Sequence, residues 1–391
     1  MASRPSGDWH FPRPQLAKHY LDAFDLGLIS AYAFHARRRM GKTEFLVRDL
    51  TPAADRRGYA VGYCNLWQED GSPLSALVDA LGQMTEGRKI AGKMRSKLMS
   101  HVSRVALSGK AVGMAEGLAE VEFKATQSEG TANLRQAFKA FDEGGNRGLL
   151  LMDEAQVLAD TRHEPVEKAL RALLDTRKDR IKVVFTGSSE DRLRRMFGVE
   201  RKAFYNWAHV EPMPLLGEEF ALELTRRANS LTTMPLGEDQ GLRVFDTLHR
   251  VPELFRRFLS QYLANAFEGV EAAVEACRQS LYSEEGFARV WNRMAPADRL
   301  LLQLVAQEQA DLHGIAVREW LGHRMQLGRA VTRSIPQNSL RRLRDRQILI
   351  QVEPGRYRFE DEVFRDWVLA TAPIGEPPER VRRRMHELRN A

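Results

Sequence analysis

The sequence predicts an α/β protein in which helices cover both faces of a parallel β-sheet, followed by a helical segment and a small C-terminal domain. Between residues 28 and 215, short apolar runs alternate with longer stretches of helical periodicity, as βα units do. The runs are continuously apolar, which is typical of strands that are buried on both faces. Residues 216–285 have helical periodicity throughout. We therefore expect three domains, over residues 1–215, 216–285 and 286–391.

Four strands are expected in the first of these domains. In chain order they are "LISAYAFHA", "YAVGYCNLW", "RGLLLMDEAQVL" and "IKVVFTGSS". A helix is expected over "KTEFLVRDLTPAA", directly after the first strand and a short loop. Apolar strands separated by helices imply a parallel sheet with a helical layer on each side.

The loop before this helix has the pattern of a phosphate-binding loop. "HARRRMGKTEF" ends in Gly41-Lys42-Thr43 and matches glycine, four free positions and Gly-Lys-Ser/Thr, except that Ala36 takes the first glycine position. In such loops backbone N–H groups surround the phosphates, the lysine contacts the terminal phosphates, and the hydroxyl ligates Mg²⁺. Alanine is small enough to let the chain turn away from its strand. The pattern predicts that ATP and Mg²⁺ bind at Arg39, Met40, Gly41, Lys42, Thr43 and Glu44.

Two acids end the third expected strand. In "LLLMDEAQ", Asp153 and Glu154 follow an apolar run, far enough from Lys42 for two strands that neighbour one another in the sheet. Asp153 would hold Mg²⁺, directly or through water, and Glu154 would polarise the attacking water. The alternative is that the pair caps the helix expected at "AQVLAD". The loop and the acids together favour nucleotide binding.

Six short motifs follow one another along the chain: "FPRPQL", "ARRRMGKTEFL", "LLLMDEAQ", "VVFTGSS", "EPMPLL" and "RYRFEDEVFRDW". In this order they resemble the archaeal-type ATPases of the STAND and AAA+ group. The resemblance implies a P-loop NTPase sheet with helices on both faces, a helical lid, and a winged-helix domain that closes on a Tyr-x-Phe … Phe-x-x-Trp pattern.

The resemblance also implies roles for single residues of the first domain. Phe11 and Arg13 would lie beside the adenine, although Pro12 replaces the family's glycine. Thr186 or Ser188 would be the sensor that contacts the γ-phosphate from the fourth strand.

Two arginines are candidates for further catalytic roles by the same resemblance. Pro252 of "RVP" stands in the lid element near which AAA+ initiators carry a sensor arginine. Arg256 is a candidate substitute, with packing or solvation on a helix as the alternative. Arg201 is a candidate arginine finger, again with a solvated surface position as the alternative.

The C-terminal domain has a basic helix before its expected hairpin. "PADRLLLQLVAQ", "IAVREWLGHRM" and "PQNSLRRLRDRQIL" fit three helices, and Pro354-Gly355 is turn chemistry for a short hairpin. A basic third helix followed by a wing is the arrangement that places a helix in the major groove of double-stranded DNA. The expected phosphate contacts are Arg341, Arg342, Arg344 and Arg346. The alternative is that this domain packs on the nucleotide domain or binds protein.

Composition restricts the remaining possibilities. The net charge of +7 and the pI of about 9.5 favour anionic partners. Two distant cysteines exclude a disulfide framework, and no leader or membrane-spanning run is apparent, so we expect a cytoplasmic protein without a membrane partner. A second basic stretch, Arg88 to Lys110, reads as an amphipathic helix or as a DNA or membrane surface.

Two functions are compatible with these observations. The first is an ATPase whose nucleotide state controls DNA binding or the assembly of a DNA-bound complex. The second is a signalling switch in which the winged helix is an internal clamp or a protein-binding module. In either case we expect homo-oligomer formation on nucleotide binding and an unidentified protein partner.

Overall fold

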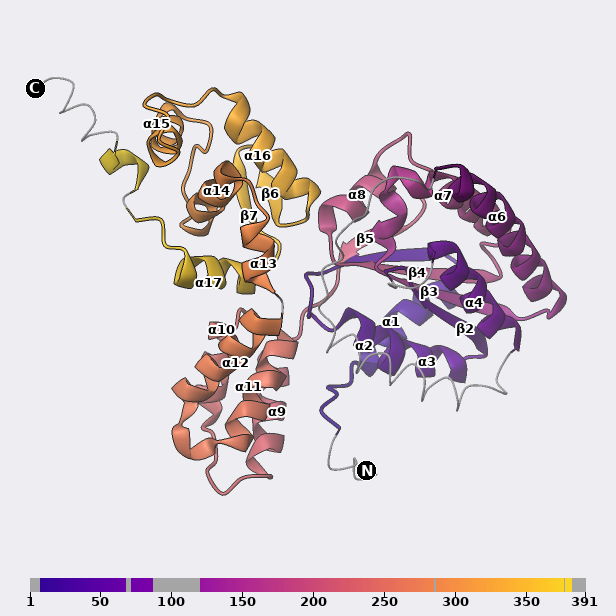
Figure 1. The fold of residues 1–391 in the computed structure, drawn as a ribbon. Helices are drawn as coiled ribbons and strands as arrows, with labels where there is room; N and C mark the ends of the chain where they lie inside the picture. Colours follow the sequence, from indigo (N-terminus) through magenta and orange to yellow (C-terminus); the bar gives the residue numbers. More distant parts are fainter. Residues whose placement is uncertain (1–7, 68–71, 87–119, 285, 376, 382–391) are drawn as a thin grey trace, which may run out of the picture. The chain divides into compact units, whose positions relative to one another are not determined.

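The computed structural model describes residues 8–67, 72–86, 120–284, 286–375 and 377–381 (Figure 1). They belong to two compact units, Met1–Ala264 and Asn265–Ala391. The segment in which the lid is expected, 216–285, extends across the boundary between these units. The basic stretch from Arg88 to Lys110 lies outside the described residues.

A five-stranded parallel sheet forms the centre of the first unit, in the order β2-β3-β4-β1-β5. The α/β class with a parallel sheet is thereby confirmed. The four apolar runs form β1 to β4, whereas the sequence does not predict the short edge strand β5, whose "HVEP" has one strongly apolar residue. The strands are β1 (Ala31–His35), β2 (Tyr59–Asn65), β3 (Arg147–Asp153), β4 (Ile181–Gly187) and β5 (His209–Pro212).

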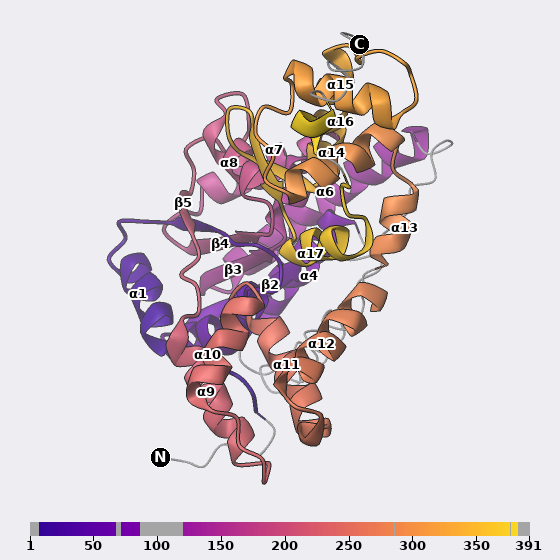
Figure 2. The ribbon, with the colours of Figure 1, turned by 90° about the vertical axis from the view of Figure 1, so that its left-hand side faces the viewer.

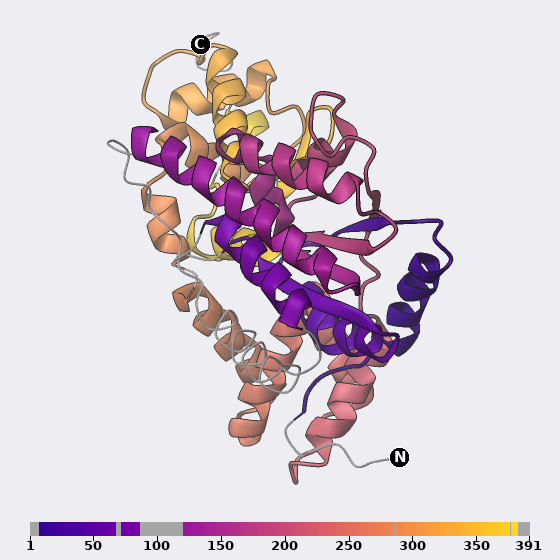
Figure 3. The same cartoon turned by 90° about the vertical axis from the view of Figure 1, so that its right-hand side faces the viewer.

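Helices cover both faces of this sheet because side chains alternate along each strand. Ala31 and Ala33 of β1 pack in a core with α4, α6, α7 and α8, whereas Tyr32 and Phe34 pack in another with α1, α2, η1 and α3. Figure 2 shows α1 and α6 on opposite sides of the sheet, and Figure 3 shows α4 and α6, in purple, side by side. The elements are α1 (Pro14–Asp25), α2 (Lys42–Phe45), the π-helix η1 (Leu46–Leu50), α3 (Thr51–Arg56), α4 (Pro73–Glu86), α6 (Glu120–Glu143), the 3₁₀ turns η3 (Ala155–Ala159) and η4 (Thr161–His163), α7 (Glu164–Asp175) and α8 (Glu190–Gly198).

Three helices complete the first unit: α9 (Glu218–Asn229), α10 (Glu238–Thr247) and α11 (Pro252–Ala264). One aromatic residue from each helix joins them. Phe245 lies 5.6 Å from Phe220 and 5.3 Å from Phe255 between ring centroids. All three rings are buried, so these helices have an aromatic core of their own.

In the second unit, the three expected helices, α14, α15 and α16, are followed by the two-stranded antiparallel hairpin β6–β7, in the expected order. Stacked aromatic side chains hold this unit together, with ring centroids 4.8 Å apart between Phe287 and Phe364 and 5.8 Å apart between Phe364 and Trp367. Trp320 is fully buried. The elements are η5 (Ala266–Glu268), α12 (Val270–Glu284), α13 (Phe287–Asn292), α14 (Pro296–Ala306), α15 (Ile315–Arg324), α16 (Ser334–Asp345), β6 (Leu349–Glu353), β7 (Arg356–Phe359) and α17 (Glu362–Thr371).

Both cysteines are buried, Cys64 on β2 and Cys277 on α12. Burial raises the pKa of the Cys64 thiol, and the charge of Asp153 raises it further. Within the described parts of the chain, no helix combines the length and the apolar character that crossing a membrane requires.

Candidate functional site

The loop between β1 and α2 is closed around the amine of Lys42. Its Nζ donates to the carbonyl oxygens of Ala36 at 2.8 Å and Arg37 at 3.1 Å. The backbone is left-handed at Arg39, with φ +65°, and at Gly41, with φ +81°. A Cβ at position 41 would meet only the Nη2 of Arg13, at 3.7 Å. The backbone angle therefore favours glycine at position 41, whereas no collision within the chain requires it.

Asp153, at the end of β3, is the centre of the site. Its side chain is fully buried and accepts hydrogen bonds from Thr43, from Thr186 at 2.5 Å and from Tyr63 at 3.2 Å. The amide of Glu154 donates to the same carboxylate at 3.0 Å. Burial raises the pKa of Asp153, as does the charge of Glu154, while the hydroxyls of Thr186 and Thr43 oppose the shift. Two sequence-predicted groups, Thr43 and Asp153, are thus in direct contact.

The strand order corrects one expectation. Strands β1 and β3 are not neighbours, because β4 lies between them and pairs with both. Thr186, near the end of β4, is therefore placed beside Asp153. Lys42, Asp153 and Thr186 still meet, because parallel strands all end at the same edge of the sheet.

Glu154 is held beside this carboxylate in a left-handed conformation, with φ +55°. Its Oε2 accepts hydrogen bonds from Ser188, at 2.7 Å, and from Gln156. Burial by itself would raise the pKa of Glu154, but the charge of Lys42 and these hydrogen bonds outweigh it and lower the pKa. The side chain makes no capping hydrogen bond to η3, so at Glu154 the capping alternative is not what the structure shows.

Glu44 joins three separate parts of the first unit. Arg256 of α11 donates to both carboxylate oxygens of Glu44, at 3.0 and 2.8 Å. The Nδ1 of His10 lies 3.2 Å from Oε1 of Glu44. Burial alone would raise the pKa of Glu44, but His10 and Arg256 lower it to about 2. The other ring nitrogen of His10 lies 3.0 Å from Asp49. Arg256, a candidate sensor from sequence, is therefore engaged with a carboxylate of α2.

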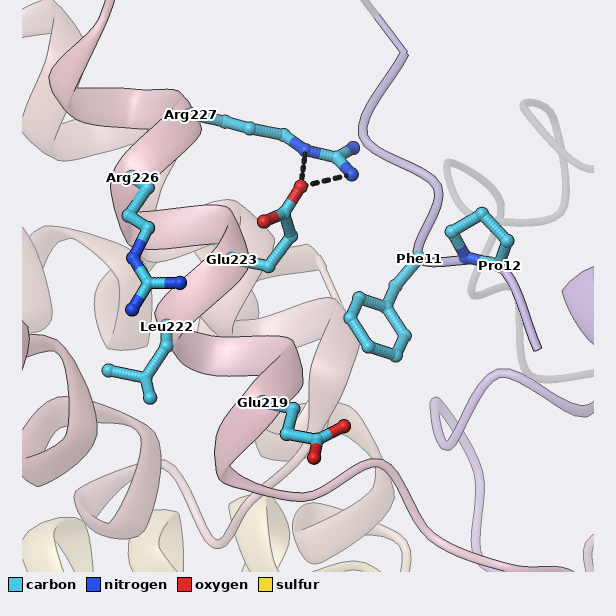
Figure 4. A pocket seen from close by; sticks show the side chains of 7 residues that line it. All are labelled: Phe11, Pro12, Glu219, Leu222, Glu223, Arg226 and Arg227. Atoms are coloured by element: carbon cyan, nitrogen blue, oxygen red, sulfur yellow. Dashed lines mark hydrogen bonds and ion pairs between the residues drawn. The ribbon is translucent and has the colours of Figure 1, made fainter. Parts of the chain in front are cut away.

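The N-terminal segment lies between the loop and α9. Arg13 donates to the carbonyl oxygen of Gly41 at 2.9 Å, and its guanidinium carbon lies 4.8 Å from the ring centroid of Phe45. Phe11 packs edge-on against Phe220 of α9 at 5.9 Å. Figure 4 shows the ring of Phe11 pointing towards α9, where Arg227 is bound to Glu223. Phe11, Pro12 and residues of α9 line a pocket of about 330 Å³.

Two other predicted residues lie apart from these contacts. Pro252 is the first residue of α11 and is buried, one helical turn before Arg256. Arg201 lies exposed in the turn that follows α8. Neither takes part in the hydrogen bonds and ion pairs just described.

The four arginines of the second unit have different surroundings. Arg341 and Arg346 are exposed, and Arg344 donates to Gln351 of β6 at 2.9 Å. Arg342 has 43% of its side chain exposed, and it also donates to the buried carboxylate of Asp298 at 2.6 Å. A buried carboxylate needs such a counter-charge, so Arg342 joins α16 to α14.

Sequence reasoning misses several groups of the site. Tyr63 and Gln156 lie in segments whose sequence indicates only the pattern of apolar residues. Their spacing gives no indication that they contact Asp153 or Glu154. His10 is separated from Glu44 by 34 residues. These contacts depend on the fold, and the sequence carries no local signal for them.

Comparisons with known proteins bear on the fold alone. No protein-family model matches the chain, and no curated protein sequence matches it significantly. Among solved structures it is similar to a Walker-type ATPase of Pyrococcus abyssi, with a TM-score of 0.61 and 15% identity over 90% of this chain and 95% of that one. It is also similar to the ORC2 protein of Aeropyrum pernix in ADPNP–ADP complexes, with a TM-score of 0.51 and 14% identity over 94% and 98% of the two chains. The ADP form of that ORC2 protein has a TM-score of 0.50 and 14% identity, over 96% and 99%. At these identities the chain shares their fold.

The ion pairs of His10 should make stability depend on pH. Burial lowers its pKa, but Asp49 and Glu44 outweigh this and raise it above the ordinary value of 6.5. The stabilisation is therefore complete below the unfolded pKa and is lost as the pH rises through the folded pKa. We expect wild type to be more stable than His10→Gln by about 1–3 kcal/mol at pH 5.5, with the difference shrinking towards pH 9.

The measurement is the free energy of unfolding of both proteins in denaturant at several pH values. His19→Gln is the control, because His19 is exposed on α1. A difference for His10→Gln that stays constant from pH 5.5 to 9 would contradict the charged state assigned to His10.

Proposed function

We propose that the chain binds ATP with Mg²⁺ at the loop 36–43 and hydrolyses it with Glu154. The observation that carries this proposal is the hydrogen bond between Thr43 and Asp153, which joins a hydroxyl and a carboxylate at the carboxyl edge of a parallel sheet. Ligands bind at this edge in open α/β sheets. Lys42 begins the helix directly after the loop, where backbone N–H groups and the helix dipole favour phosphate.

The oxygen donors at this edge fit Mg²⁺. In nucleotide sites Mg²⁺ takes one or two protein oxygens and completes its shell with phosphates and water. Thr43 and Asp153 supply these oxygens, and within the described residues no cluster of three or more His, Cys, Asp or Glu side chains competes for a metal ion. The bound ion would neutralise phosphate charge and counteract the burial that raises the pKa of Asp153.

Glu154 is suited to orient the attacking water. Both hydrogen bonds from Ser188 and Gln156 go to Oε2, and we assign Oε1 as the acceptor for water. The lowered pKa keeps the carboxylate ionised at neutral pH, as a proton acceptor requires. Thr186 donates to Asp153 and Ser188 donates to Glu154, so the proposed sensor residues contact the proposed metal-binding and catalytic carboxylates directly.

We further propose that nucleotide state controls DNA binding through the second unit. The support is a basic helix, α16, followed by the hairpin β6–β7, with Arg341 and Arg346 exposed. Arg342 is paired with Asp298, so the other three arginines of the predicted set, Arg341, Arg344 and Arg346, are available for phosphate contacts. The competing proposal is a signalling switch in which this unit, which we propose to be a winged helix because of its order of elements, is an internal clamp or binds protein. Oligomer formation on nucleotide binding is part of both proposals.

Mg-ATP should stabilise the protein. At one hundred times its dissociation constant it should add about 2.7 kcal/mol to the free energy of unfolding, because only the folded loop binds it. Lys42→Ala should lose the shift, whereas Lys18→Ala, on an exposed face of α1, should keep it. Thermal unfolding with and without Mg-ATP measures this, and an unchanged melting temperature of wild type would refute the nucleotide site.

Glu154→Gln should bind ATP and turn it over slowly. The amide keeps the shape of the side chain and its contacts with Ser188 while removing basicity, so kcat should fall by roughly 10²- to 10⁴-fold. Phosphate release and ATP binding are measured on the same preparation. Equal turnover in wild type and variant would show that Glu154 is not the base.

Arg341→Gln/Arg346→Gln should weaken binding to duplex DNA on all sequences alike. Each lost phosphate contact lowers the slope of log affinity against log salt by about 0.9, so the slope should fall by about 1.8. Arg289→Gln/Arg293→Gln removes two exposed charges from α13 and the residue after it and should change little. Absence of DNA binding by wild type, with or without ATP, would favour the signalling switch.

A further inference from the structure

Arg38, in the phosphate-binding loop, lies over the ring of Trp67. Its guanidinium carbon is 4.4 Å from the ring centroid. Both residues are exposed, and 47% of the Trp67 surface is open to solvent. The contact joins the loop after β1 to the residues that follow β2.

This contact crosses the edge of the sheet at which the acids lie. In the strand order β2-β3-β4-β1, the ends of β3 and β4 separate the two residues. Asn65 of β2 is in register with Asp153, and the amide of Leu66 donates to the carbonyl oxygen of Asp153 at 3.0 Å. Because all four strands are parallel, their carboxyl ends form one edge of the sheet. Arg38 therefore extends across the edge at which Asp153 and Glu154 lie.

The positive charge of Arg38 affects the pKa of Glu154 at that edge. The pKa of Glu154, which burial would raise, is lowered by Lys42, by hydrogen bonds from Gln156 and Ser188, and also by Arg38. Lys42 is held by two carbonyl oxygens of the loop, whereas Arg38 is exposed and rests on an uncharged ring. Among the described residues, no carboxylate is in ion-pair contact with its guanidinium.

We propose that Arg38 binds the terminal phosphate of the nucleoside triphosphate, and that Trp67 positions its guanidinium while that phosphate is absent. The inference rests on the proposed nucleotide site. A cation on an exposed aromatic face is held more weakly than one hydrogen-bonded to phosphate oxygens. A triphosphate therefore draws Arg38 away from Trp67, whereas a diphosphate leaves it in place. Once bound, Arg38 neutralises charge that develops on the transferred phosphoryl group.

The test compares Mg-ADP with a non-hydrolysable Mg-ATP analogue, using tryptophan fluorescence and calorimetric affinities. Wild type should show a fluorescence change specific to the triphosphate, and Trp67→Phe should remove it. Arg38→Ala should abolish this change, weaken triphosphate binding roughly tenfold or more and leave diphosphate binding unaltered. Its kcat for ATP should fall by roughly 10²- to 10³-fold.

Two further variants separate this role from a structural one. Arg38→Lys keeps the charge but not the planar fork, and should retain part of the preference for triphosphate. Arg195→Ala removes an exposed arginine paired with Asp191 on α8 and should change neither affinity. If Arg38→Ala weakens the binding of both nucleotides equally, or leaves the ratio of their affinities unchanged for any other reason, the role of Arg38 is refuted and the proposed nucleotide site is not. Failure of wild type to bind either nucleotide overturns the proposed site as well.

Discussion

A buried carboxylate must be hydrogen-bonded, and at Asp153 the chain meets this requirement with donors from four places. They are Tyr63 of β2, Thr43 of α2, the amide that follows β3 and Thr186 of β4. Leaving such a group unsatisfied is costly, so the strand ends and the phosphate-binding loop are fixed relative to one another. The strand order serves the same requirement, because it places β4, with Thr186, between the loop and the acid.

A second carboxylate, Glu44, also connects the phosphate-binding loop to other parts of the first unit. Glu44 belongs to the short helix that begins at Lys42, and it binds Arg256 of α11 and His10 of the N-terminal segment. Any movement of the loop that displaces Glu44 therefore acts on α11 and on the N-terminal segment together. This gives the proposed nucleotide site a direct physical connection to the helices α9, α10 and α11.

The parts of the structure that the sequence predicts are those with a local signal. Continuous apolar runs indicate β1 to β4, and Gly41 to Thr43 with Asp153 indicate the edge where a nucleotide would bind. The strand β5 escapes prediction because it is short and partly exposed. The place of β4 between β1 and β3 and the pair Glu44–Arg256, whose members are 212 residues apart, depend on tertiary packing. Arg256 itself is noticeable in the sequence, but its partner is not.

The burial of both cysteines has a practical consequence for following the two units in solution. The chain contains two cysteines in all, one in each unit, and neither is accessible. Thiol reagents attack the exposed thiolate, and buried thiols are inert. A cysteine introduced on the surface of either unit is therefore the group that a maleimide modifies in the folded chain. Fluorophores or spin labels can be attached to a chosen unit without first replacing the native residues.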